Sequence, residues 1–296
     1  MSAGSAAHGQ ISVIIAAHDE EHVIGATLDS LLAQDVDSPL EIIVSANGCT
    51  DRTVAVASRP MVRVINREAP GKAGALNAAE ALATGFPRLY LDADIVVPTG
   101  GIAAMLKVLE SDPKAAAVMP RRRLNVAGRP WPVRGYSAIH ERLPTFRTGL
   151  FGRGMVMISE AGRARFERFP ELIADDLFLD GQFSDDEKVQ VDEVEVLVEA
   201  PYATADLLRR LVRVRRGNAQ LRRLAATGEV FAAVRAPDRL AWLRDVVLPE
   251  PRLVFAGVTY AAVSLVAAFL ARRPDKTRLG WGRDESTRRA AASNKE

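Results

Sequence analysis

The segment Ile11-Ser-Val-Ile-Ile-Ala16, followed by Ala17-His-Asp-Glu20, decides the fold class. A short, nearly continuous apolar run is typical of a parallel strand that is buried on both faces. An amphipathic helix is expected directly after it, because apolar side chains recur there at helical spacing. These side chains are Ile24, Leu28, Leu31 and Leu32.

Strand and helix patterns alternate four times within the first ninety or so residues. Such alternation predicts right-handed crossovers and an α/β fold, with a mostly parallel central sheet flanked by helices. In such sheets ligands bind beyond the carboxyl ends of the strands. The candidates are therefore the polar residues that follow the strands: His18, Asp19, Glu20, Asn47, Asp51, Asp92 and Asp94.

The second half of the chain is less regular. Residues 121–144 are rich in Arg, Pro and Gly, which predicts a long surface connection. We expect a catalytic domain over residues 1–235 and a C-terminal helical segment with a basic tail over residues 236–296.

Composition excludes several classes of protein. The 296 residues carry a formal charge of only +2, so a nucleic-acid binder driven by bulk charge is not expected. Cys49 is the single cysteine, which excludes an intramolecular disulfide and a cysteine-based metal cage. The first ten residues lack the charged start of a secretory signal, so we expect a cytoplasmic protein.

Asp92-Ala-Asp94 ends an apolar strand and places two carboxylates at the expected ligand edge. Two oxygen ligands at this spacing can hold Mg²⁺, which usually completes its shell with substrate phosphates, and Mn²⁺ prefers similar ligands. Asp-x-Asp alone is weak evidence, but its position after the fourth strand favours a metal site.

Four motifs in this order resemble family 2 glycosyltransferases, a large inverting group with a GT-A fold. They are Ile11 to Glu21, Ser45-Ala-Asn-Gly-Cys-Thr-Asp51, Gly71-Lys-Ala-Gly-Ala-Leu-Asn77 and Tyr90-Leu-Asp-Ala-Asp94. Together they are far more specific than any one of them. The resemblance extends loosely to about Gly217.

The resemblance implies a role for each matching residue. Asp94 resembles the direct ligand of a divalent cation, Mn²⁺ or Mg²⁺, with Asp92 nearer the ribose or one step from the metal. Ala17, His18 and Glu20 resemble the nucleoside-binding loop, and Lys72 the substrate-contacting lysine. Alternatively, Lys72 is an ordinary surface lysine without a function. A cation at a helix start is electrostatically disfavoured, which favours the functional interpretation.

Ile173-Ala-Asp-Asp-Leu177 resembles the Glu-Asp element that supplies the family's catalytic base. Asp176 is then the base and Asp175 the supporting acid. An acidic surface stretch could produce this match by chance, because Asp180, Asp185 and Asp186 follow closely. Gly152 and Gly154 match an acceptor-site loop more weakly.

Seven arginines lie between Arg209 and Arg223. They could contact a diphosphate, for which Arg216 is the candidate, or anionic lipid head groups, or they could form a solvated face. The Gln-x-x-Arg-Trp motif of processive members is missing here, which favours transfer of a single sugar. Ala46-Asn47 also replaces the usual Asp-Asp pair, so UDP is not assured.

Residues 253–271 carry no charge and, as a helix, would span about 28 Å, close to the roughly 30 Å hydrocarbon core. The segment is rich in alanine, and residues 237–248 have the composition of a helix lying at an interface. Spanning, surface binding and packing on the domain stay open. We expect peripheral membrane contact through residues 237–273, at the cytoplasmic face.

The expected function is metal-dependent transfer of a single sugar from a nucleotide diphosphate to a hydroxyl acceptor, with inversion. A lipid-linked acceptor is one of the options. A nucleotidyltransferase is the first alternative, but the first loop lacks the Gly and Arg that such enzymes usually carry. The second is a non-catalytic scaffold that binds a nucleotide sugar or a lipid.

Overall fold

The computed structural model describes residues 9–236 and 238–273. Contacts divide the chain into two compact units. Unit 1 comprises Met1–Arg122, Gly152–Glu171 and Gln182–Val196, and unit 2 comprises Arg123–Phe151, Leu172–Gly181 and Leu197–Glu296. The predicted domain boundary after residue 235 lies within unit 2. Most of the predicted basic tail, from residue 274, lies outside the described residues.

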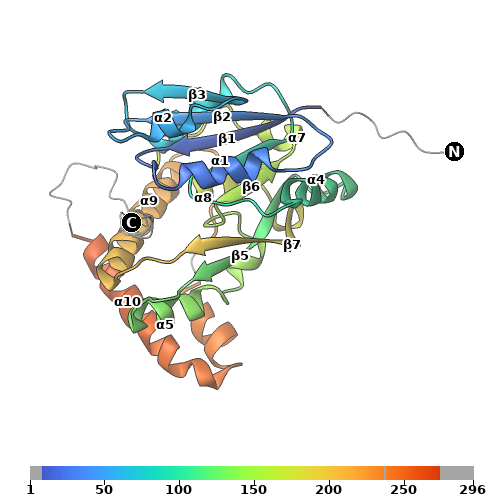
Figure 1. Ribbon diagram of the computed structural model, residues 1–296. Helices are drawn as coiled ribbons and strands as arrows, with labels where there is room; N and C mark the ends of the chain where they lie inside the picture. The colour runs from blue at the N-terminus through green and yellow to red at the C-terminus, as the bar shows by residue number, and fades with distance from the viewer. Residues whose placement is uncertain (1–8, 237, 274–296) are drawn as a thin grey trace. The chain divides into compact units, whose positions relative to one another are not determined.

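A seven-stranded sheet has the order β3-β2-β1-β4-β6-β5-β7 (Figure 1). The first four strands in this order pair in parallel, whereas β6 is antiparallel to β4 and β5. This confirms the predicted α/β fold with a mostly parallel sheet. The strands are β1 (Ile11–Ala17), β2 (Leu40–Asn47), β3 (Val62–Arg67), β4 (Arg88–Asp92), β5 (Ala117–Asn125), β6 (Met155–Ile158) and β7 (Lys188–Glu199).

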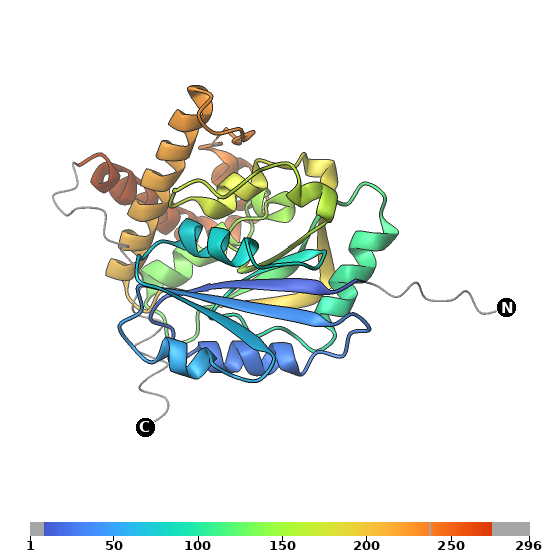
Figure 2. The same ribbon diagram turned by 90° about the horizontal axis from the view of Figure 1, so that it is seen from above.

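Strand β1 lies at the centre of unit 1, and every residue of it except Ala16 is buried. Helices α1 and α2 lie on one face of the parallel strands and α3 on the other (Figure 2). Strand β1 is therefore covered on both sides, which explains its continuous apolar sequence. The helices of unit 1 are α1 (Ile24–Leu32), α2 (Thr53–Ala57), α3 (Lys72–Glu80), α4 (Gly101–Ser111), α7 (Glu160–Arg163) and the 3₁₀ turn η1 (Asp185–Glu187).

A buried cluster of polar side chains fixes α3 to β4 and α7. The Glu80 carboxylate accepts hydrogen bonds from the Tyr90 hydroxyl at 2.6 Å and from Arg163 Nε at 2.9 Å. Arg88 Nε lies 3.4 Å from the same carboxylate, and both side chains are almost fully buried. Burial, and next the Glu80 charge, raises the pKa of Tyr90 well above its ordinary value, so the phenol stays a donor.

Unit 2 is built mainly from helices. Helix α10 packs along α5 and α9, and two apolar clusters fill the space between the helices. Tyr136 of α5 stacks on Tyr260 of α10 with ring centroids 4.9 Å apart. The helices are α5 (Trp131–His140), α6 (Thr145–Thr148), α8 (Asp175–Asp180), α9 (Thr204–Ala226), the π-helical segment η2 (Trp242–Val247), the 3₁₀ turn η3 (Pro251–Leu253) and α10 (Val254–Ala271).

The prediction of a surface connection over residues 121–144 is wrong. The last part of β5 and all of α5 lie there. The arginines of β5 belong to its exposed half, and Pro130-Trp131-Pro132 begins a helix, because proline is favoured in the first turn. Val133, Tyr136 and Ile139 then form the buried face of α5.

Replacing Glu80 with alanine should lower the free energy of unfolding by about 3 kcal/mol, because the buried Arg88 and the largely buried Arg163 would lose their shared carboxylate. Urea denaturation measures this loss. Glu68→Ala, at an exposed position, is the matched control and should change it by about 0.5 kcal/mol or less. Equal stability of the two variants would show that the cluster does not hold α3 in place.

Candidate functional site

The carboxyl ends of three strands meet at one edge of the sheet in unit 1. In the register, Ala17 of β1 is opposite Ala46 of β2, and Ala16 is opposite Asp92 of β4. The loops that follow these strands therefore begin side by side, and they carry most of the predicted site residues. This is the edge at which parallel sheets bind ligands.

Asn47 links these loops to the start of α3. Its side chain is fully buried. Nδ2 donates to the carbonyl of Ala17 at 2.7 Å, and Oδ1 accepts from the Gly71 amide at 2.9 Å. The backbone carbonyl of Asn47 contacts Nδ1 of His18. The Asn47 side chain therefore positions the backbone of two loops, and its predicted substrate contact stays a prediction.

Asp51 similarly holds the loop after β1. Its carboxylate accepts from the Glu21 amide at 3.1 Å and from the Thr53 amide at 2.9 Å. The Thr53 hydroxyl in turn accepts from the Glu20 amide at 2.6 Å. The backbone that carries Glu20 is therefore fixed before any substrate binds.

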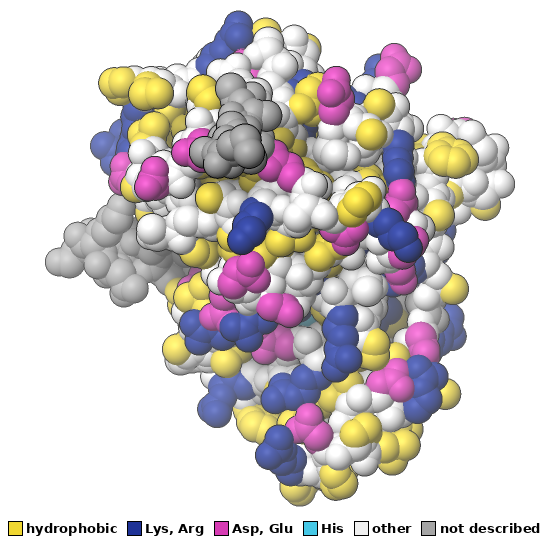
Figure 3. Space-filling model, turned by 90° about the vertical axis from the view of Figure 1, so that its right-hand side faces the viewer, with side chains coloured by type: hydrophobic (Ala, Val, Ile, Leu, Met, Phe, Trp, Pro, Cys, Tyr) yellow, Lys and Arg dark blue, Asp and Glu magenta, His cyan; other side chains and the backbone are white. Residues whose placement is uncertain are grey.

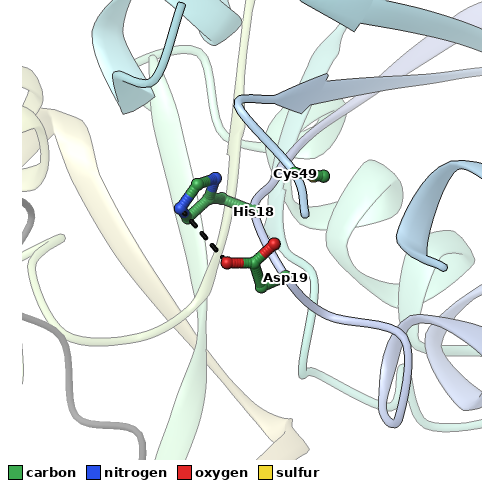
Figure 4. A group of neighbouring side chains, drawn as sticks. All are labelled: His18, Asp19 and Cys49. Carbon is green, nitrogen blue, oxygen red and sulfur yellow. Dashed lines mark ion pairs between the residues drawn. The ribbon is translucent and has the colours of Figure 1, made fainter. Parts of the chain in front are cut away.

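His18, Asp19 and Cys49 form a small cluster in these loops (Figure 4), with ligand atoms within 4.8 Å of one another. His18 Nε2 lies 3.5 Å from Asp19 Oδ2, and Asp19 also accepts from the Thr50 amide at 2.7 Å. Burial raises the pKa of the Cys49 thiol, which favours the protonated form, whereas metal ligands and nucleophiles are thiolates. Through Asn47 and Thr50, His18 and Asp19 join the loop after β1 to the loop after β2.

Asp19 is a candidate site residue only because it follows the first strand, and the sequence indicates no role for it. It adopts a positive φ of 51°, which is uncommon outside glycine and is best tolerated by Asn and Asp. The turn that it makes brings its carboxylate to Thr50. No spacing pattern encodes such a contact between two loops.

Lys72, Asp92 and Gly154 come together from three separate segments. Lys72 Nζ lies 2.9 Å from Asp92 Oδ1, and the Asp92 amide donates to the Gly154 carbonyl at 2.7 Å. Lys72 is the first residue of α3 and follows Gly71, whose φ is 146°. The ammonium group of Lys72 thus reaches the Asp92 carboxylate despite its unfavourable position at a helix start.

Gly154 has to be a glycine at this place. Its φ is 70°, and a Cβ atom would lie 2.6 Å from Ile95 Cγ1 and 3.4 Å from Asp92 Oδ2. Gly152 also has a positive φ, and its carbonyl lies 3.3 Å from Arg122 Nη1. Both predicted glycines therefore shape the loop before β6, next to the end of β4.

The donor set at this edge fits a divalent cation. Asp94 is exposed and Asp92 is half-exposed, so their oxygen atoms can be reached from solvent. Hard carboxylate oxygens suit Mg²⁺ and Mn²⁺, and two protein ligands leave room for phosphate and water oxygens. The Asp92 carboxylate already pairs with one cation, the ammonium group of Lys72.

Asp175 and Asp176 begin α8 in unit 2. Asp176 is exposed, and its Oδ1 accepts from the Leu177 amide at 2.8 Å. The segment that precedes the two aspartates packs closely on α9, where a Cβ on Gly217 would lie 3.0 Å from Ile173 Cβ. Asp180, by contrast, is buried and bonds to the Leu150 amide and to Arg235 Nε at 3.0 and 3.2 Å. The acidic stretch therefore contains the exposed Asp176, the half-buried Asp175 and the structural residue Asp180.

Arg216 contacts the carboxyl end of α10. Its Nη2 donates to the Arg273 carbonyl at 3.0 Å, and its Nε to the Ala271 carbonyl at 3.5 Å. These bonds satisfy carbonyls that lack partners at the end of a helix. These bonds give Arg216 a structural contact in unit 2, and its predicted diphosphate contact stays a prediction.

Comparison with known proteins identifies relatives of this chain. The sequence of residues 12–166 matches the protein-family model described as glycosyl transferase family 2. The mannosyltransferase PcManGT from Pyrobaculum calidifontis, in complex with GDP-Man and Mn²⁺, is 21% identical with a TM-score of 0.56, over 96% of this chain and 79% of that chain. Glucosyl-3-phosphoglycerate synthase from Mycobacterium tuberculosis, in complex with Mg²⁺ and UDP, is 22% identical with a TM-score of 0.53, over 78% and 81%.

TarS 1–349 from S. aureus, in complex with UDP, is 15% identical with a TM-score of 0.51, over 93% of this chain and 95% of that chain. No match was found among curated proteins. At these identities the solved structures establish the fold, and the predicted GT-A-like architecture is confirmed.

Asn47→Ala should lower the free energy of unfolding by about 1–3 kcal/mol, because the Ala17 carbonyl and the Gly71 amide would lose their partner. Asn47→Asp should do the same, since a carboxylate cannot donate to Ala17. Urea denaturation measures both. Asn66→Ala is the control at an exposed asparagine near the end of the neighbouring strand β3. A loss as small as that of the control would exclude the linking role.

Proposed function

The chain belongs to glycosyl transferase family 2, and on that premise we propose a metal-dependent transfer of one sugar from a nucleotide diphosphate to a hydroxyl acceptor, with inversion. One observation carries the proposal. Lys72, Asp92 and Gly154, which come from three segments, converge at the carboxyl edge of the sheet. A cation and an oxygen-rich pair of carboxylates at one place suit a diphosphate and its metal.

The donor would lie across the ends of β1, β2 and β4. Asp94, with Asp92 beside it, would hold Mn²⁺ or Mg²⁺, which when bound neutralises charge on the diphosphate. Lys72 would leave Asp92 to contact the phosphates. Ala17, His18 and Glu20 would line the nucleoside, on a loop that Asn47 and Asp51 hold in place.

The nucleobase is left open. Ala46 stands where many relatives have an aspartate that reads uracil, and the solved relatives include complexes with GDP-Man and with UDP. The fold thus accommodates either base. GDP- and dTDP-sugars are as compatible with this sequence as UDP-sugars.

Asp176 is proposed as the catalytic base, supported by Asp175. Its carboxylate would take the proton of the acceptor hydroxyl while the hydroxyl oxygen attacks the anomeric carbon. The bond from that carbon to the diphosphate breaks as the new bond forms, and the nucleoside diphosphate leaves. One displacement of this kind inverts the anomeric centre and needs no covalent enzyme intermediate.

The acceptor would be bound by the loop of Gly152 and Gly154, within the proposed catalytic domain 1–235. We propose a lipid-linked hydroxyl compound, which would meet the enzyme where residues 237–273 contact the cytoplasmic face of a membrane. No nucleic-acid partner is proposed, since the net charge is near zero and basic and acidic side chains are interspersed on the face seen in Figure 3.

Family membership favours this function over the two alternatives. A nucleotidyltransferase would form a sugar nucleotide from a sugar phosphate and a nucleoside triphosphate. A scaffold would bind a nucleotide sugar without turnover. Release of a nucleoside diphosphate from a sugar nucleotide, in the presence of Mn²⁺, distinguishes the proposed function from both.

Asp94→Asn should reduce turnover of the sugar nucleotide by about 10²–10³-fold, because the leaving diphosphate would lose most of its charge compensation. The assay measures release of nucleoside diphosphate over a series of Mn²⁺ concentrations. Asp37→Asn, at an exposed loop position, is the control and should leave the rate unchanged. Full activity with unaltered Mn²⁺ dependence in Asp94→Asn would refute the assignment of the metal ligand.

Asp176→Asn should slow transfer by about 10²–10⁴-fold through loss of the base, while nucleotide still raises the melting temperature in the presence of Mn²⁺. Asp186→Asn, from the same acidic stretch, should behave as the wild type. Loss of both transfer and nucleotide binding in Asp176→Asn would assign that residue a structural role instead.

A further inference from the structure

One face of α10 is apolar along its whole length and exposed. Its members are Phe255, Val258, Ala262, Leu265, Val266 and Phe269, which we call the α10 face. Phe255 and Leu265 are 74% and 70% exposed. Single exposed apolar residues are ordinary, but a continuous stripe marks a surface that binds something. We propose that the α10 face docks on an anionic membrane surface, with the helix lying along that surface and not crossing it.

The opposite face of α10 is fixed within unit 2. Ala256, Gly257, Val263 and Ala267 are buried, and Trp131 Nε1 of α5 donates to Thr259 Oγ1 at 3.1 Å. A Cβ on Gly257 would lie 2.7 Å from Val247 Cγ2. Contacts this close belong to a permanent helix packing. The helix is therefore part of the fold of unit 2, and the α10 face is what this packing leaves uncovered among the described residues.

By length and composition, Pro251–Ala271 could cross a membrane, with a mean hydropathy of 2.2 and 22% of its most apolar window buried. Helix α9 argues against crossing. Arg215 of α9 donates through Nη2 to the Ser264 carbonyl at 3.1 Å, near the middle of α10. A spanning α10 would carry this guanidinium to the centre of the bilayer, together with the other arginines of α9, at a high cost in free energy.

A helix that lies in the interface avoids this cost. Its apolar side chains enter the boundary between head groups and acyl chains by about 5–10 Å. On the other side, α9 and its arginines stay in water or among head groups. Only the α10 face has to enter the apolar layer, and no charged residue occurs between Leu253 and Ala271.

Charge at the end of α10 favours an anionic surface over a second copy of this chain. Arg272 and Arg273 follow the last turn and are exposed, and the Arg273 guanidinium lies 4.7 Å from the centre of the Phe269 ring. A second copy would present the same arginines. Near the amino end of α10, the acidic residue closest in sequence is Glu250, which pairs with Arg252 at 2.8 Å. A second copy would therefore bring no unengaged acid from this position to the arginines. A surface of lipid phosphates complements both the stripe and its basic end.

This docking does not depend on the proposed catalytic residues, and it goes beyond the transfer reaction by defining how the protein meets a membrane. If both hold, the acceptor is presented by a lipid at the same surface. Failure of either can be recognised separately, because vesicle binding requires no substrate and release of nucleoside diphosphate requires no vesicle.

The test is sedimentation of the full chain with vesicles that contain phosphatidylglycerol and with vesicles of phosphatidylcholine alone. The wild type should bind the anionic vesicles more strongly, and added salt should weaken that binding. The double variant Val258→Glu, Leu265→Glu should lower the partition coefficient between anionic vesicles and water by about tenfold or more. The reason is that each apolar side chain would be replaced by a charge. Phe255→Ser is a second, milder variant. Leu32→Glu, at an exposed leucine of α1, is the matched control and should bind as the wild type.

Thermal unfolding and release of nucleoside diphosphate without vesicles should be unchanged in the α10 variants, which separates lost docking from lost folding. Four results would overturn the proposal. They are wild-type binding by both α10 variants, no binding of the wild type to anionic vesicles, retention of the protein in vesicles after alkaline carbonate extraction, and a wild-type dimer that the α10 variants convert to monomers.

Discussion

The buried amide of Asn47 is the interaction on which the ligand edge depends. It donates to the loop after β1, accepts from the start of α3, and itself ends β2. A buried amide that makes both bonds stabilises a single arrangement, because any rearrangement leaves buried backbone groups without partners. Lys72 comes one residue after the accepted amide and reaches Asp92 from there. The position of the cation beside the carboxylates thus follows from a side chain that need not touch substrate.

Much of the fold of the first half of the chain could be predicted, because the sequence patterns that indicate it are local. The apolar run of β1 and the Asp-x-Asp after β4 are each complete within a few residues, and parallel topology then brings strand ends together. Contacts between loops are different. The pairing of Asn47 with Gly71, and the positive φ of Asp19, depend on tertiary packing that no spacing reveals.

The second half shows where composition misleads. Arginines along the exposed half of β5 and prolines at the start of α5 resemble a loop by content, although each occupies a regular element. The hydrogen bond from Arg216 to the end of α10 is likewise a tertiary contact that the sequence pattern does not indicate. A residue type defines what a side chain can bind, and packing decides what it does bind.

The most direct test of the account is the melting temperature of the full chain with UDP, GDP, dTDP and CDP, each with and without Mn²⁺. A ligand that binds only the folded state raises this temperature. If a cation at Asp92 and Asp94 joins the diphosphate to the protein, at least one nucleotide should stabilise the fold with Mn²⁺ and much less without it. Stabilisation that is the same with and without Mn²⁺, or none by any nucleotide, would contradict the central claim.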